Sequence, residues 1–188
     1  WDIDLNEEAA SGTLITFEEE ETMEQAVVSG IAFNRDEAKI SVLGVPDTPG
    51  IAYQILGAVA DANIEVDVII QNLSKDGKTD FSFTVHRNDF QKTLDLLKTK
   101  VVPTLGAAEV VGDARICKVS IVGIGMRSHV GVASRMFKCL SLEGINIQMI
   151  STSEIKTSVV IDEKYMELAV RSLHREFDLD QTADTITG

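Results

Sequence analysis

Apolar and polar residues alternate along several short segments of this chain, and two of these segments are near copies of each other. Residues 40–45 read Ile-Ser-Val-Leu-Gly-Val and residues 119–124 read Val-Ser-Ile-Val-Gly-Ile, so every position agrees in residue class. After a turn that is two residues longer in the second copy, the match resumes between 64–69 and 145–150. A repeat that continues beyond an insertion is a specific signal, and it predicts two similar modules.

The first repeat predicts the order strand, helix, strand, strand, helix, strand. Residues 39–45 alternate and are rich in β-branched side chains, which is typical of a strand, and apolar residues recur at helical spacing over 51–59. Asp47 or Thr48 is expected to cap this helix, with Pro49 in its first turn. The remaining expected elements are strands at 64–71, 80–86 and 107–111, an Asp-Gly hairpin turn at 75–78, and a helix capped by Asn88.

The second repeat follows the same order but lacks a final strand, because residues 178–188 are polar. Its expected elements are strands at 117–124, 145–151 and 156–161 and helices at 131–142 and 164–177. An unassigned strand pattern at 26–33 is expected to complete this module, so the first module would be inserted within the second. The expected division is a leader at 1–25, module one at 39–112, module two at 26–38 plus 113–178, and a polar tail at 179–188.

The predicted fold class is α+β, with two tandem ferredoxin-like βαββαβ modules whose antiparallel sheets carry helices on one face. The net charge of −13 argues against binding to nucleic acid or to an anionic membrane. No apolar run approaches 18 residues, and the N-terminus has no signal-peptide pattern. Cys117 and Cys139 lie in apolar segments, so we expect buried free thiols in a reducing cytoplasm; a disulfide is the alternative.

Signals for catalysis are weak throughout the chain. We find no phosphate-binding loop, no nucleophile elbow and no cluster with metal-ligand spacing, so we expect no catalysis by this chain alone, no metal and no cofactor. Gly123-Ile124-Gly125 is only half of a dinucleotide fingerprint. The run Glu18–Glu21 is interpreted as solvated. The same fold order serves RNA recognition, but the strands carry Val, Ile and Ser instead of aromatics.

Four strings carry a resemblance to a known family. They are Val45–Gly50, Ile70–Asn72 with Thr79–Phe81, Gly123–Ala133, and Asn146–Ile155. They resemble the regulatory part of bacterial aspartate kinases, which consists of paired ACT modules, and the resemblance covers about residues 12–178. It implies feedback inhibition by lysine, threonine or both, a homodimer formed through the modules, and a catalytic domain or large subunit as partner.

The resemblance also implies an effector-binding set. Around the first turn it comprises Val45, Asp47, Gly50, Ile51, Ala52, Gln71 and Ser74, completed from the other module by Asn146 and Ile147. Around the second turn it comprises Met126, Ser128, His129, Gly131, Val132, Ser153 and Glu154. Asp67 stands where family members vary, which leaves the identity of the effector open.

The chemistry suits a free amino acid, which presents an ammonium and a carboxylate on one carbon. Backbone N–H groups near a glycine at a helix N-terminus attract the carboxylate, while side-chain oxygens accept from the ammonium. Structural alternatives stay open: the glycines serve only the turns, Asp47 and Ser128 only cap, Met126 fills the core, and Gln71 pairs with Asn146 without a ligand. A free-standing ACT sensor that controls another protein is the alternative function.

Overall fold

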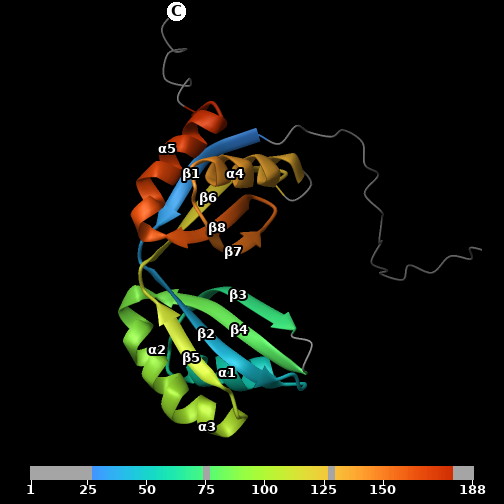
Figure 1. Cartoon of the computed structure of the whole chain (residues 1–188), viewed down its shortest axis with the longest axis vertical. Helices are drawn as coiled ribbons and strands as arrows, with labels where there is room; N and C mark the ends of the chain where they lie inside the picture. Colours follow the sequence, from blue (N-terminus) through green and yellow to red (C-terminus); the bar gives the residue numbers. More distant parts are fainter. Residues whose placement is uncertain (1–26, 74–76, 127–129, 180–188) are drawn as a thin grey trace, which may run out of the picture.

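The computed structural model describes residues 27–73, 77–126 and 130–179, and it contains two α+β modules (Figure 1). Each has one antiparallel four-stranded sheet, with strand orders β3-β4-β2-β5 and β1-β6-β8-β7. The predicted fold class of two tandem ferredoxin-like modules is confirmed. The expected leader and polar tail, 1–25 and 179–188, lie almost wholly outside the described residues.

The first module contains the elements that the first repeat predicted. Its strands are β2 (Glu37–Pro46), β3 (Val66–Leu73), β4 (Lys78–His86) and β5 (Glu109–Asp113). Its helices are α1 (Ile51–Asp61), α2 (Phe90–Leu96) and α3 (Val102–Leu105), with a 3₁₀ turn at Arg87–Asp89 and a π-helical stretch at Leu97–Val101. The hairpin turn expected at 75–78 lies mostly outside the described residues.

In the second module, β1 lies beside β6, although the whole first module separates them in sequence (Figure 1). Its strands are β1 (Val27–Asn34), β6 (Ile116–Ile124), β7 (Ile147–Thr152) and β8 (Lys156–Asp162). Its helices are α4 (Val130–Leu142) and α5 (Met166–Glu176), the latter preceded by a 3₁₀ turn at Glu163–Tyr165. The β1–β6 pairing supports the proposal that module one is inserted within module two.

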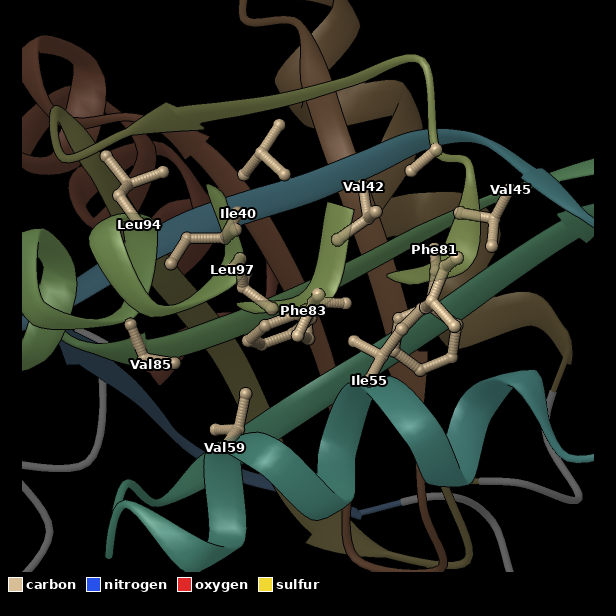
Figure 2. Packing of buried hydrophobic residues seen from close by; sticks show 14 of the residues in the cluster. Ile40, Val42, Val45, Ile55, Val59, Phe81, Phe83, Val85, Leu94 and Leu97 are labelled. Carbon is tan, nitrogen blue, oxygen red and sulfur yellow. The ribbon is translucent and has the colours of Figure 1, made fainter. Parts of the chain in front are cut away.

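The first core lies between the sheet and its helices (Figure 2). Alternate residues of β2 and β4 point to this side, and Phe81 and Phe83 pack there with ring centroids 6.1 Å apart. Ile55 and Val59 of α1 are fully buried against them. Every second residue of the strands and residues one turn apart on the helix therefore pack in one apolar layer, which the hydrophobic effect stabilises.

Two predicted helix caps were wrong. The N-cap of α1 is Gly50, with φ 92°, and no side-chain hydrogen bond caps this helix, so Asp47 and Thr48 stay outside it. The helical segment after β4 is capped two residues earlier than expected, because the His86 side chain accepts from the backbone N–H of Asn88. Both side chains expected to cap α1 therefore remain available to other partners.

The modules contact each other through the sheet faces that their helices leave open. A small apolar cluster spans the junction, with Val68 and Ile70 on one side and Ile116, Met149 and Val160 on the other. Polar contacts also cross the junction. Lys39 Nζ donates to Gln148 Oε1 at 2.5 Å, and Arg87 Nη1 pairs with Glu163 Oε1 at 3.1 Å.

Candidate functional site

A hollow of about 410 Å³ lies where β2 ends and α1 begins. Five of the predicted effector-binding residues stand around it: Asp47, Gly50, the buried Ile51, Ala52 and Gln71. The first four come from the β2–α1 turn and the start of α1, while Gln71 comes from β3, at the edge of the sheet. Thr48 and Pro49 also line the hollow, and sequence reasoning had assigned these two residues only to the helix start.

The backbone of the turn is held by its own hydrogen bonds. Asp47 N donates to Gly77 O at 3.0 Å, and Thr48 N donates to Pro46 O at 3.0 Å. Gly50 has φ 92°, a left-handed value that favours glycine, and its carbonyl accepts from Gln54 N at 3.0 Å. The first turn of α1 thus begins at the hollow, where helical N–H groups and the helix dipole favour a negatively charged group.

Opposite polarity is available at the same hollow. The side chains of Asp47 and Gln71 are exposed there, and carboxylate and amide oxygens accept hydrogen bonds from an ammonium. The helix end, which attracts a negatively charged group, and two side chains that accept hydrogen bonds from an ammonium therefore lie around one small hollow. This arrangement can hold a zwitterion.

Some predicted site residues have side chains that face the core instead. Val45 is fully buried, and Ile51, Met126 and Val132 are 5%, 2% and 7% exposed. Their side chains belong to the two apolar cores, so they can offer a ligand only backbone groups. The sequence alternative that Met126 fills the core is confirmed.

The second turn is described only in part. Met126 N donates to Glu154 O at 3.0 Å, so the β6 end and the β7–β8 turn lie together, and Ser153 N donates to Lys156 O at 2.8 Å. Gly131 is exposed in the first turn of α4. The predicted residues Ser128 and His129, and Ser74 of the first site, lie outside the described residues.

Asn146 and Ile147 lie in a different place from the first hollow. They line a separate hollow of about 410 Å³ with Ser141, Gly144 and Ile145, where α4 ends and β7 begins. One chain therefore does not bring them to Asp47 and Gln71. The predicted joint site requires a second chain.

The sequence did not predict the contacts of Lys118, a partly buried lysine at the module junction. Lys118 of β6 pairs with Glu37 and Asp67 of the first module and is 13% exposed. Burial acts to lower the pKa of Lys118, but hydrogen bonds to Asp67 and Glu37 outweigh it and raise the pKa. Burial acts to raise the pKa of Asp67, yet the hydrogen bond and charge of Lys118 outweigh it and lower the pKa. Only the alternation that places Lys118 on the open sheet face hinted at this contact.

The described residues were also compared with the requirements of a reactive cysteine, a metal site and a membrane-spanning helix. Cys117 and Cys139 are buried and free, and burial raises the pKa of the Cys117 thiol to about 12. Within residues 27–73, 77–126 and 130–179, no three His, Cys, Asp or Glu side chains are grouped so as to hold a metal ion. None of the described helices combines the length and apolar character needed to span a membrane.

Comparisons with known proteins agree with this architecture. A family model described as "ACT domain" matches residues 40–101 and 119–177. An aspartate kinase of Stutzerimonas stutzeri is 64% identical over 172 residues, which are 92% of this chain and 42% of that protein. The chain thus spans about two fifths of the length of this curated relative.

Two solved structures are similar over most of this chain. The aspartokinase alpha and beta subunits have a TM-score of 0.76 and 64% sequence identity, covering 81% of this chain and 99% of that one. The ligand-free regulatory subunit of aspartate kinase from Thermus thermophilus has a TM-score of 0.76 and 39% identity, covering 80% of this chain and 99% of that one.

Proposed function

Because this chain belongs to the ACT domain family, as the regulatory part of an aspartate kinase, we propose that it binds lysine, threonine or both as end-product inhibitors. The observation that carries the proposal is the single hollow that gathers Asp47, Gln71 and the N-terminus of α1. The partner would be the kinase catalytic domain or large subunit, which the longer relatives suggest.

The two charged groups of the effector would bind to different parts of the hollow. Its carboxylate would accept from N–H groups in the first turn of α1, where Gly50 leaves the backbone open. Its ammonium would donate to the Asp47 carboxylate and the Gln71 amide oxygen. The ligand would therefore need both an ammonium and a carboxylate, so a simple amine or a simple carboxylic acid would not bind as an effector does.

Side-chain selectivity would differ between the two turns. We assign threonine to the first, where the Gln71 amide suits a hydroxyl group, and lysine to the second, where the Glu154 carboxylate suits an ε-ammonium. A crystal structure with both amino acids bound would test the assignment, and the reverse placement would overturn it.

A second chain would complete the site. Asn146 and Ile147 lie in their own hollow, and the exposed Ile69 and Ile150 lie on β3 and β7, the edge strands of the two sheets. Pairing of such edges in a homodimer would cover them and bring Asn146 of one chain to Gln71 of its partner. Sedimentation analysis at micromolar concentration would then give a dimer.

Inhibition would follow from a shift between conformations. An effector that binds one mutual arrangement of the modules more tightly than another favours that arrangement, and the difference in affinity limits the inhibition it can produce. The alternative is a free-standing sensor for another protein. Mixing the chain with the catalytic part of an aspartate kinase distinguishes these two functions. Lysine or threonine would inhibit the phosphorylation of aspartate in the mixture only if the chain regulates the kinase.

Substitutions at the hollow test the binding site itself. Gln71→Ala and Asn146→Ala each remove a hydrogen-bonding side chain from an exposed position, so we expect effector affinity to fall about tenfold with little change in stability. The matched control is Gln91→Ala on α2, whose side chain donates to Asp95 and does not line the hollow. Calorimetric titration measures the affinities. Unchanged binding in both variants would show that the site is elsewhere.

A further inference from the structure

The polar contacts between the two modules repeat the correspondence found in the sequence. Lys118 of β6 pairs with Asp67 of β3, and Lys39 of β2 donates to Gln148 of β7 at 2.5 Å. Lys39 corresponds to Lys118 in the repeat, and Asp67 corresponds to Gln148. β2 and β6 are inner strands, whereas β3 and β7 are edge strands. An inner strand of each module therefore holds the edge strand of the other module by an equivalent contact.

Both edge strands are bulged where they make this contact. The register of β3 with β4 shifts around Asp67 and Val68, and the register of β7 with β8 shifts at Gln148. A bulge turns a side chain out of the regular alternation of a strand. On β3 the bulge is held by a hydrogen bond from Val68 N to the buried Thr84 Oγ1 at 3.1 Å. Bulges at equivalent positions indicate that the contact with the other module is specified in both strands.

β3 connects the module junction to the hollow at α1. Val68 and Ile70 pack into the apolar cluster between the modules, and the next residue, Gln71, lines the hollow. Because β3 is an edge strand, the backbone hydrogen bonds of the sheet hold it on one side only, through β4. The position of Gln71 therefore depends on the contacts that fix β3 from the second module, and the pair of Lys118 with Asp67 is the charged one among them.

Lys118 is itself held firmly enough to serve as an anchor for β3. Its side chain is 13% exposed, and it also pairs with Glu37, whose side chain is 5% exposed. Because both side chains are largely withdrawn from water, this pair is screened less than an ion pair on the surface. Glu37 begins β2, an inner strand of module one. One ammonium thus joins β2 and β3 of module one to β6 of module two.

We propose that Lys118 is a positioning residue for the effector hollow, acting through Asp67 and β3 on Gln71. The inference rests on the proposed binding of an amino acid beside Gln71. Lys118 is outside the set of described residues that line this hollow, so it acts by holding β3 in the conformation that presents Gln71. Linkage makes the effect reciprocal: an effector that fixes Gln71 stabilises the module junction as much as the junction stabilises effector binding.

The test combines calorimetric titration of the whole chain with threonine and with lysine, and hydrogen–deuterium exchange without either. For the amino acid whose binding Gln71→Ala weakens, we expect the affinity to fall about fivefold in Lys118→Gln. Exchange in β3 should become about tenfold faster, while exchange in β5, the other edge strand of this sheet, stays unchanged. Lys118→Arg keeps the charge and should behave as the wild type does. The matched control is Lys98→Gln, which removes the same charge from an exposed position.

Asp67→Ala is the second variant, because it leaves Lys118 paired with Glu37 and provides the same test if Lys118→Gln does not fold. Unchanged affinity in a folded variant would overturn the positioning role and leave the proposed function intact. Faster exchange throughout the chain, instead of in β3, would indicate only a loss of global stability and would also overturn it. Absence of binding by either amino acid in the wild type would overturn the proposed function and the positioning role together, while exchange in β3 would still show whether Lys118 holds that strand.

Discussion

Gly50 and Gly131 stand at equivalent places in the two repeats but have different backbone conformations. Gly50 has φ 92°, whereas Gly131 is outside the left-handed region, and a Cβ atom at either position would meet nothing within 4 Å. Only position 50 therefore needs glycine, because its backbone conformation would strain another residue. Neither position lacks room for a side chain. The sequence repeat could not reveal this, because both positions carry the same residue.

We predict that Gly50→Ala lowers the free energy of unfolding by about 1 kcal/mol, because an L-residue is strained at this φ. Gly131→Ala should leave it unchanged or raise it by up to about 1 kcal/mol, because alanine favours a helix. Urea unfolding of both variants measures the difference. Equal destabilisation would contradict the conformational explanation.

A pH-dependent contribution is expected from Asp67, whose pKa is lowered by Lys118. A lowered pKa means that the folded state favours the ionised carboxylate, so the stabilisation is present above the ordinary value of about 3.9 and is lost as the pH falls through the lowered folded value. Asp67→Asn should thus be less stable than the wild type at pH 7, and the difference should begin to shrink below about pH 4 and vanish below the lowered folded pKa. A constant difference between pH 7 and pH 3 would argue against the ion pair.

At the scale of elements, β5 depends on a close approach of α2. A Cβ atom added at Gly112 would lie 2.6 Å from Phe90 Cε2 and 3.2 Å from Leu94 Cδ2. We expect Gly112→Ala to cost about 1–3 kcal/mol, the usual range for overpacking. Gly57→Ala on α1 is the control: its Cβ would have ordinary contacts with Tyr53 at 3.8 Å, and it should be neutral or stabilising. Thermal unfolding compares the two, and an unaffected Gly112→Ala would show that the Phe90 ring moves away freely.

The elements were largely predictable because their signals are local. Alternation placed the strands within about two residues, and helical spacing placed α1, α4 and α5. The caps were not predictable. The N-cap of α1 is Gly50, which has no capping side chain, and the other cap is the side chain of His86, a residue type that is not a favoured N-cap. The π-helical stretch at Leu97–Val101 likewise had no signal in the apolar pattern.

The candidate site was predictable only in part, because some of its expected residues are far apart in the sequence. Asp47, Gly50 and Ala52 lie close together in sequence, and the resemblance added Gln71 from β3, the strand that follows α1; all four line one hollow. Asn146 and Ile147 lie in a separate hollow, and their association with that site stays a prediction about a second chain. The contacts of Lys118 depend on how two sheets face each other, which no local pattern encodes.

At the scale of the whole molecule, the modules are joined by charged and apolar contacts that a ligand can bias. The apolar cluster around Met149 and the pairs made by Lys118 and Arg87 cross the same junction. Since both module sheets take part, the proposed effector binding at one turn would be coupled to the other turn through this junction. Coupling of that kind is reciprocal: each ligand changes the affinity of the other by the same factor.

The most direct test of the account is calorimetric titration of the chain with lysine and with threonine, each alone and in the presence of the other. We expect saturable binding of at least one amino acid, weakened about tenfold in Gln71→Ala and unchanged in Gln91→Ala, and a reciprocal change in affinity where both bind. Absence of binding by either amino acid, with the chain folded and dimeric, would contradict it.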